Sequence, residues 1–196
     1  MLYVITSYRV SQNNPSSCGS ETYYMQQWQQ LQLDGTEQPN PRQRTLQALK
    51  EFILPLIHDN HEIIVMIDAN SSHLDPIVDT FLHQTNLHDI TTEYLPDQPP
   101  PTYQRGQHKI DHIWGTPGIL TATVGAGILP YGTGPKSDHT ILYCDISMAI
   151  LSGLSTQSIH DPTHPASHNL WSTDIKAANK YIELVTHGFQ AANISQ

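Results

Sequence analysis

A carboxylate and an amide follow an apolar run in the first half of the chain. Ile63 to Ile67 is a short, continuous apolar segment, typical of a strand buried on both faces, and Asp68 and Asn70 come directly after it. On extended backbone, residues two apart point to the same side. A carboxylate can hold a metal ion or accept a proton from water, and an amide can orient the reacting group. The same residues also suit an Asx turn that opens a loop, and taken alone the pattern favours that turn.

A second carboxylate, Asp111, interrupts a strand-like segment that runs from Lys109 to Ile113. A carboxylate that faces into a sheet is costly unless it is paired, which suggests a partner such as a histidine. The alternative is simple alternation, which places Lys109, Asp111 and Ile113 on one solvent-facing side. Taken alone, the pattern favours this alternation.

A carboxylate and an imidazole are adjacent in Ser137-Asp138-His139, just before a predicted strand. Neighbouring residues on a strand face opposite sides, so one of the two can bind a metal ion while the other contacts a phosphate. A polar turn is the alternative, and it is favoured when the motif is taken alone. Tyr8 ends the first predicted strand, where a tyrosine is more typical of packing.

Taken together and in order, these segments resemble the endonuclease/exonuclease/phosphatase superfamily, which includes apurinic endonucleases, pancreatic deoxyribonuclease and inositol polyphosphate phosphatases. The Thr-Tyr-x-Arg-Gly motif, followed by Ile-Asp, is most similar to the endonuclease domains of retrotransposon-type proteins. The matching segments are Ser7-Tyr8-Arg9, Ile67-Asp68-Ala69-Asn70, Thr102 to Gly106 with Ile110-Asp111, and Ser137-Asp138-His139. The resemblance covers about residues 1–146.

The resemblance implies a layered α/β sandwich and metal-dependent hydrolysis of phosphodiesters, with Mg²⁺ or Mn²⁺ as cofactor. It implies nucleic acid as partner, DNA more than RNA. It also implies a role for each matching residue. Asp68 is then the base, Asn70 orients the attack, Asp138 is a metal ligand, His139 donates to the phosphate and is held by Asp111, and Tyr8 contacts the phosphate from the other side.

The sequence departs from the superfamily pattern at its start. In the family, a metal-binding Glu and an Asn come from strands that precede the strand matched by residues 2–10, and no residues here supply them. We therefore expect a domain truncated at its N-terminus, with weak activity or none and poor metal affinity. Two alternatives stay open: a phosphomonoesterase on the same scaffold, and a catalytically silent fragment that acts only as a binding module.

Periodicity and turn residues predict the elements that must position these side chains. We expect Asp68, Asp111 and His139 to converge at one end of a sheet, with helices over one face. Asn40, Pro41 and Gln43 suit the start of a helix, which Pro55 kinks or ends. The predicted strands are 2–10, 62–67, 109–116, 119–129 and 140–146, and the predicted helices are 21–33, 41–57 and 75–85.

Residues 1–146 are interpreted as the partial domain, and residues 147–196 as a linker followed by a C-terminal helix at about 173–190. No period is visible in 147–172, which we therefore expect to pack poorly.

Composition narrows the classes of partner. The 196 residues include 9 basic and 18 acidic side chains, a formal net charge of −9, so the chain lacks the general electrostatic footprint of a nucleic-acid-binding protein. A divalent metal, with Arg9, Arg105, Lys109 and Lys136 near the motifs, could still bring phosphate close.

No apolar run reaches the roughly 18 residues of a membrane span. No signal peptide is recognised, which predicts an intracellular protein, nuclear or cytoplasmic. The oligomeric state is open.

Overall fold

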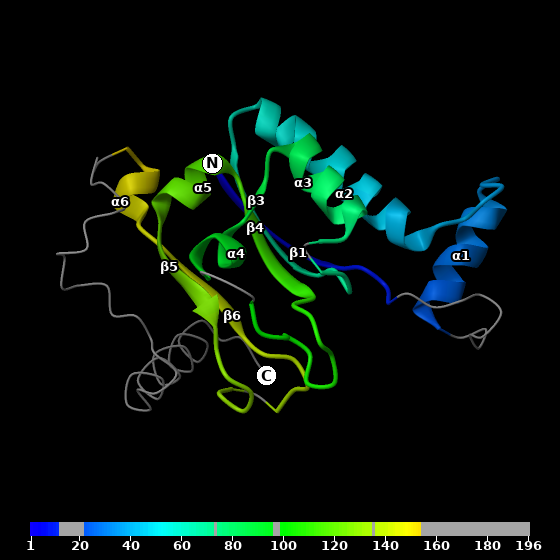
Figure 1. Cartoon of the computed structure of the whole chain (residues 1–196). Coiled ribbons are helices and arrows are strands. Elements are labelled where there is room, and N and C mark those ends of the chain that lie inside the picture. The colour runs from blue at the N-terminus through cyan, green and yellow to red at the C-terminus, as the bar shows by residue number, and fades with distance from the viewer. Residues whose placement is uncertain (12–21, 73, 96–98, 135, 154–196) are drawn as a thin grey trace, which may run out of the picture.

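The computed structural model describes residues 1–11, 22–72, 74–95, 99–134 and 136–153. Strands and helices are mixed along the chain, as predicted (Figure 1). In order they are β1 (Leu2–Tyr8), α1 (Tyr23–Leu33), α2 (Pro41–His58), β2 (Glu62–Asp68), α3 (Pro76–Thr85), β3 (His88–Asp89), α4 (Ile90–Tyr94), β4 (Asp111–Gly115), α5 (Pro117–Ala122), β5 (Thr123–Ile128), β6 (Leu142–Ile146) and α6 (Met148–Leu151).

The larger sheet has the strand order β1-β2-β4-β3. β1 and β2 are parallel, so their carboxyl ends lie at the same edge, whereas β4 is antiparallel to both β2 and β3. The first residue of β4 therefore lies at the same edge of the sheet as the last residues of β1 and β2, and it pairs with the last residue of β2. Strands β5 and β6 form a separate antiparallel pair.

Each face of the larger sheet contributes to its own hydrophobic core. Helices α2 and α3 pack over one face, where Leu49, Ile53, Val65 and Trp114 are buried. The other face packs against α4, α5 and the β5–β6 pair (Figure 1). The predicted layered α/β architecture is confirmed. The helical cover consists of α2 and α3, because α1 packs against α2 and buries none of its own side chains.

Helix α2 starts where the sequence predicts and ends later. The Asn40 side chain accepts a hydrogen bond from the Gln43 backbone N at 3.0 Å, with Pro41 in the first turn. Pro55 lies inside the helix, which continues to His58. Of the two outcomes expected for Pro55, a kink or an end, the end is excluded, and the observed helix ends one residue after the predicted range 41–57. Burial of Leu46, Leu49 and Ile53 against the sheet holds the helix together through the proline.

The predicted strand 119–129 is wrong in its first part. Residues 117–122 form α5, and the strand β5 begins only at Thr123. Pro117 fixes the backbone angle of the first helical turn, and the Thr123 hydroxyl donates to the Ile119 carbonyl at 2.8 Å. The short elements β3, α4 and α6 were not predicted.

The expected poor packing of 147–172 does not extend to its first residues, because Leu151 of α6 contacts the second core. The remainder of that segment and the predicted helix at 173–190 lie outside the described residues. Among the described residues, no helix is both long and apolar enough to cross a bilayer.

Candidate functional site

Three polar side chains stand in line at one edge of the larger sheet. Tyr8 pairs in register with Asp68, and Asp68 pairs with Asp111, so all three project from the same face of β1, β2 and β4. The antiparallel direction of β4 explains why Asp111 begins its strand while Asp68 ends its own. The predicted convergence of Asp68 and Asp111 at one end of the sheet is confirmed.

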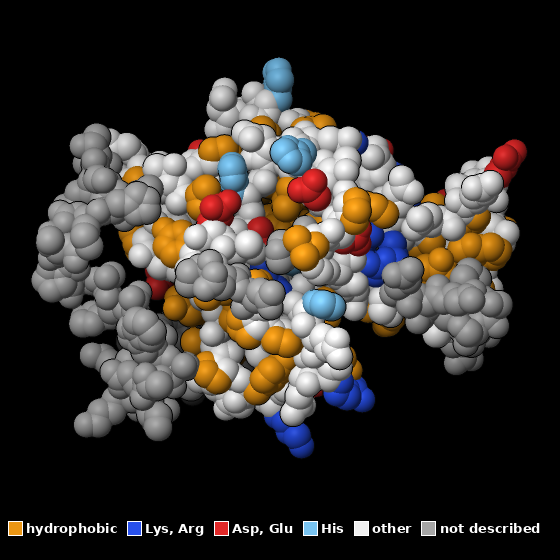
Figure 2. All heavy atoms as spheres, in the orientation of Figure 1, with side chains coloured by type: hydrophobic (Ala, Val, Ile, Leu, Met, Phe, Trp, Pro, Cys, Tyr) orange, Lys and Arg blue, Asp and Glu red, His pale blue; other side chains and the backbone are white. Residues whose placement is uncertain are grey.

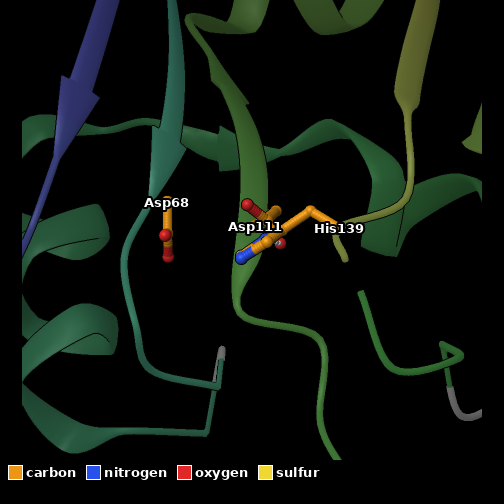
Figure 3. Close-up of side chains that lie close together, drawn as sticks. All are labelled: Asp68, Asp111 and His139. Atoms are coloured by element: carbon orange, nitrogen blue, oxygen red, sulfur yellow. Dashed lines mark hydrogen bonds and ion pairs between the residues drawn. The ribbon is translucent and has the colours of Figure 1, made fainter. Parts of the chain in front are cut away.

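His139 reaches the same place from the loop before β6 (Figure 3). A short antiparallel bridge pairs His139 with Tyr103, and their rings are 5.2 Å apart. The imidazole Nδ1 lies 2.9 Å from Asp111 Oδ2. Because a carboxylate only accepts, Nδ1–H is the donor, and Nε2 is left facing away from Asp111. The histidine partner predicted for Asp111 is therefore present.

Thr102 connects the two segments that carry Asp111 and His139. Its hydroxyl accepts from the backbone N–H groups of Ile110 and Asp111, at 2.9 and 3.0 Å, and its carbonyl accepts from Thr140 N at 2.8 Å. Thr102 is fully buried. Sequence reasoning included Thr102 in a motif but assigned it no role, since nothing in the spacing indicates which backbone amides a hydroxyl reaches.

Asp68, Asp111 and His139 form a cluster whose ligand atoms all lie within 4.8 Å of one another. All three side chains are partly buried. Two carboxylate oxygens and one imidazole nitrogen suit a divalent ion such as Mg²⁺ or Mn²⁺, which prefer oxygen ligands. The donor set therefore fits a divalent cation, although Asp111 is already hydrogen-bonded to His139.

The environment raises the pKa of two members of this cluster. Burial raises the pKa of Asp68 above its ordinary value; the Asn70 N–H opposes the shift, and the charge of Asp111 adds to it. Burial works to lower the pKa of His139, but the hydrogen bond and charge of Asp111, with smaller effects from Asp68 and Asp138, outweigh it and raise the pKa. Asp68 is thereby a better proton acceptor than an ordinary aspartate, and His139 is cationic over a wider pH range.

Asn70 and Tyr8 flank the cluster in different ways. Asn70 has a positive φ of 47°, its backbone N donates to Asp68 Oδ1 at 3.0 Å, and its side-chain Nδ2 donates to the Arg9 carbonyl at 2.7 Å. Asn70 thus fastens the end of β2 to the end of β1. The Tyr8 side chain is 52% exposed on the same face as Asp68.

Asp138 does not join the cluster. Its carboxylate is 52% exposed and lies 3.6 Å from Arg105 Nη2, and its backbone carbonyl accepts from Gln104 N. Arg105 and Lys136 are exposed, but Arg9 and Lys109 are 1% and 2% exposed, so the expectation that these two contact nucleic acid was wrong. A single sequence does not reveal that these cations are enclosed. Basic side chains are few and scattered on the face shown in Figure 2.

Comparison with known proteins finds no family model and no curated protein that matches the chain. Three solved structures are similar in fold. The 3′ phosphatase NExo from Neisseria, bound to a product DNA hairpin, is 16% identical with a TM-score of 0.47, and the match covers 53% of this chain and 52% of that one. The human Nocturnin catalytic domain with a bound sulfate anion is 23% identical with a TM-score of 0.43, over 54% and 40% of the two chains. The 3′-5′ exonuclease NExo from Neisseria meningitidis is 16% identical with a TM-score of 0.45, over 59% and 54%.

These matches span about half of the solved chains or less. The similarity of this chain to these structures concerns the fold alone.

Proposed function

We propose that this site hydrolyses phosphodiesters of nucleic acid with the help of a divalent cation. The observation that carries the proposal is the cluster of Asp68, Asp111 and His139 at the strand ends. In it, Asp68 forms no ion pair with another described residue, and Asp111 holds the imidazole of His139.

Each side chain supplies one part of an in-line displacement. Asp68, with its raised pKa, takes a proton from the attacking water, whose oxygen bonds to phosphorus as the opposite P–O ester bond breaks. The leaving alcohol takes its proton from solvent. His139 donates its Nε2–H to a phosphoryl oxygen, while Asp111 accepts from Nδ1–H and so fixes the ring orientation. Tyr8, in register with Asp68 on the neighbouring strand, contacts the phosphate from the side opposite His139.

The cluster would hold Mg²⁺ or Mn²⁺ through Asp68 and Asp111. A bound divalent ion supplies positive charge for the phosphoryl oxygens, which this acidic chain otherwise provides only sparsely. The motif resemblance implies Asp138 as a ligand, but Asp138 would have to leave Arg105 to reach the cluster, so the proposed ligand set does not include it.

Nucleic acid is proposed as substrate, DNA before RNA, because the motifs resemble retrotransposon-type endonucleases. Arg105 and Lys136 lie exposed on the segments that carry Tyr103 and His139, where they can contact neighbouring phosphates. The NExo structure of similar fold contains a product DNA hairpin, which makes DNA the first substrate to test.

The test is cleavage of plasmid DNA, single-stranded RNA and a phosphomonoester by the purified chain, with and without Mg²⁺ or Mn²⁺. Asp68→Asn and His139→Gln should each lower the rate by about 10²–10⁴-fold, as loss of a base or a charge-stabilising donor does. Asp145→Asn removes an exposed carboxylate of β6 and should change little. Metal-dependent cleavage that survives both substitutions would contradict the assigned roles.

The position of Asp138 favours one second candidate. This carboxylate pairs with Arg105 outside the cluster, so few ligands remain there for a metal ion. A sparse ligand set is what we expect of a catalytically silent binding module. Binding of DNA without cleavage at any metal concentration would support that alternative. Hydrolysis of the phosphomonoester alone would support a phosphomonoesterase.

A further inference from the structure

Three consecutive backbone carbonyls directly after Asp68 each accept a hydrogen bond from a basic side chain. Arg9 Nη1 lies 3.4 Å from the Ala69 carbonyl, Arg42 Nη2 lies 3.1 Å from the Asn70 carbonyl, and His112 Nε2 lies 2.8 Å from the Ser71 carbonyl. The donors belong to the end of β1, to α2 and to β4. We call Arg9, Arg42 and His112 the carbonyl clamp.

All three side chains of the carbonyl clamp are buried, at 1%, 8% and 1% exposure. Buried basic groups are costly unless each donor finds an acceptor. Arg9 and Arg42 both also donate to the Ser71 hydroxyl, which in turn donates to Asp75 at 2.6 Å. The fold thus directs three enclosed basic groups at one turn of three residues.

His112 is oriented from its other side by a buried ion pair. Its Nδ1 lies 2.6 Å from Asp89 Oδ2, and Lys109 Nζ binds both oxygens of Asp89, at 2.8 and 2.6 Å. A carbonyl only accepts, so Nε2 donates to Ser71, while Nδ1 lies between Asp89 Oδ2 and Lys109 Nζ, which is 3.1 Å away. The ring has no freedom to turn away from the Ser71 carbonyl without breaking the bond to Asp89.

The turn held in this way sets the direction of the Asp68 carboxylate. The Asn70 N–H donates to Asp68 Oδ1, and this geometry depends on the positive φ of Asn70. His112 is the residue after Asp111, so its bond to Ser71 also ties the turn that carries Asp68 to the strand that carries Asp111.

We propose that Arg9, Arg42 and His112 are positioning residues: the carbonyl clamp fixes the turn from Ala69 to Ser71, and with it the orientation of the Asp68 carboxylate relative to Asp111. The effect on catalysis rests on the proposed function. The positioning itself is measurable without any activity.

The test uses the full chain with two substitutions of His112. His112→Leu removes both ring nitrogens, whereas His112→Gln keeps an N–H donor toward the Ser71 carbonyl. Hydrogen exchange of the Asn70 backbone amide, followed by NMR, reports directly on the bond to Asp68. Exchange should accelerate by about tenfold or more in His112→Leu, as for loss of a charge-assisted hydrogen bond, and should return toward wild type in His112→Gln.

Thr85→Val is the matched control, because it removes a buried hydroxyl of the same core whose bonds go to Phe81 and Leu82 within α3. It should lower the melting temperature without accelerating Asn70 exchange. If His112→Leu leaves Asn70 exchange unchanged, or if it behaves like Thr85→Val, the positioning role is overturned.

A second pair of variants, at Arg42, tests the proposal if His112→Leu does not fold. Arg42→Met should accelerate Asn70 exchange and Arg42→Lys should largely restore it, and equal exchange in both variants would overturn the proposal. If the wild type hydrolyses phosphodiesters, the restoring variants should recover kcat with KM unchanged. If the wild type hydrolyses none, the proposed function fails, while the exchange data still decide the role of the carbonyl clamp.

Discussion

At the scale of single residues, the site is an acid and a base whose pKa values are both raised. The partly desolvated Asp68 binds a proton more tightly than an ordinary aspartate, and His139 is kept cationic by Asp111. Asp68 can act as a base only when it is ionised, and His139 can donate only when it is protonated. Both conditions are met together only between the two pKa values. Any hydrolysis should therefore be lost at acid pH as Asp68 protonates, and at alkaline pH as His139 loses its proton.

Replacing Asp111 by Asn removes the negative charge beside His139 but keeps an acceptor for the hydrogen bond. The amide oxygen can still accept from His139 Nδ1–H, but the negative charge that raises the pKa is gone. We expect the pKa of His139 in Asp111→Asn to fall below that of the wild type, as measured by NMR titration of the imidazole resonances.

Asp138→Asn is the control for that titration, because Asp138 contributes least of the three carboxylates that raise the pKa of His139. Its shift should be the smaller of the two. A larger shift in Asp138→Asn than in Asp111→Asn would mean that Asp138, and not Asp111, holds the imidazole.

Metal binding distinguishes the ligand set proposed from the cluster from the ligand that the motif resemblance implies. The cluster contains Asp68 and Asp111 but not Asp138, which the motif resemblance implies as ligand. Titration with Mn²⁺ should show an affinity lowered by about tenfold or more in Asp68→Asn and nearly unchanged in Asp138→Asn. The reverse order would support Asp138 as ligand and contradict the ligand set proposed from the cluster.

The sequence predicted the catalytic candidates better than their surroundings. Asp68 and His139 are recognisable because the short motifs that contain them fall in the order of one superfamily, although each motif alone favours a turn. The burial of Arg9 and Lys109 was missed, since their partners Arg42, Ser71 and Asp89 lie 20 to 62 positions away in sequence. Which cation is enclosed depends on packing between elements, and that information is not local.

At the scale of elements, Thr102 joins the start of β4 to the segment that carries His139. One hydroxyl accepts from two consecutive backbone amides, so its loss leaves two partly buried donors without that partner. Thr102→Val keeps the shape of the side chain and should lower the free energy of unfolding by about 2 kcal/mol in urea denaturation.

Thr80→Val serves as the control for Thr102. The Thr80 hydroxyl is exposed and bonds only within α3, so this change should stay within about 0.5 kcal/mol of wild type. An equal loss of stability in both variants would show that the two amides near Thr102 find other partners.

The accuracy of the predicted elements follows from their length. The 18 residues of α2 and the apolar strand β2 carry enough periodic or continuous apolar sequence to be recognised. The 2-residue strand β3 and the 5-residue helix α4 are too short for any period. In α5, the β-branched Ile119 and Thr121 favour a strand locally, and burial of Ile119 and Ala122 decides for the helix.

At the scale of the whole molecule, ionisable groups with shifted pKa values make the stability of the fold depend on pH in two opposing ways. For Asp89, burial works to raise the pKa, but the bonds to His112 and Lys109 outweigh it and lower the pKa far below the ordinary value. Asp75 is lowered too, mainly by the Ser71 hydroxyl against the effect of burial. Such groups stabilise the fold above the unfolded pKa of about 4, and that stability is lost as the pH falls.

His139 acts in the opposite direction. Because its folded pKa lies above the unfolded value of about 6.5, it stabilises the fold fully below that pH, and the contribution is lost as the pH rises through the folded pKa. The raised pKa of Asp68 has the same sign, so ionisation of Asp68 above pH ~4 costs stability. The melting temperature should therefore be highest in weakly acidic solution, between about pH 4 and 6.5, and should decline on either side.

Substitution of His139 tests this interpretation at the alkaline side. Melting curves between about pH 6 and 8.5 should show a decline for the wild type that is flattened in His139→Gln, because the amide binds no proton in either state. The control His58→Gln changes a histidine whose side chain is 91% exposed at the end of α2, and it should retain the decline. A decline that persists unchanged in His139→Gln would show that other groups, and not the Asp111–His139 pair, make the fold sensitive to pH in this range.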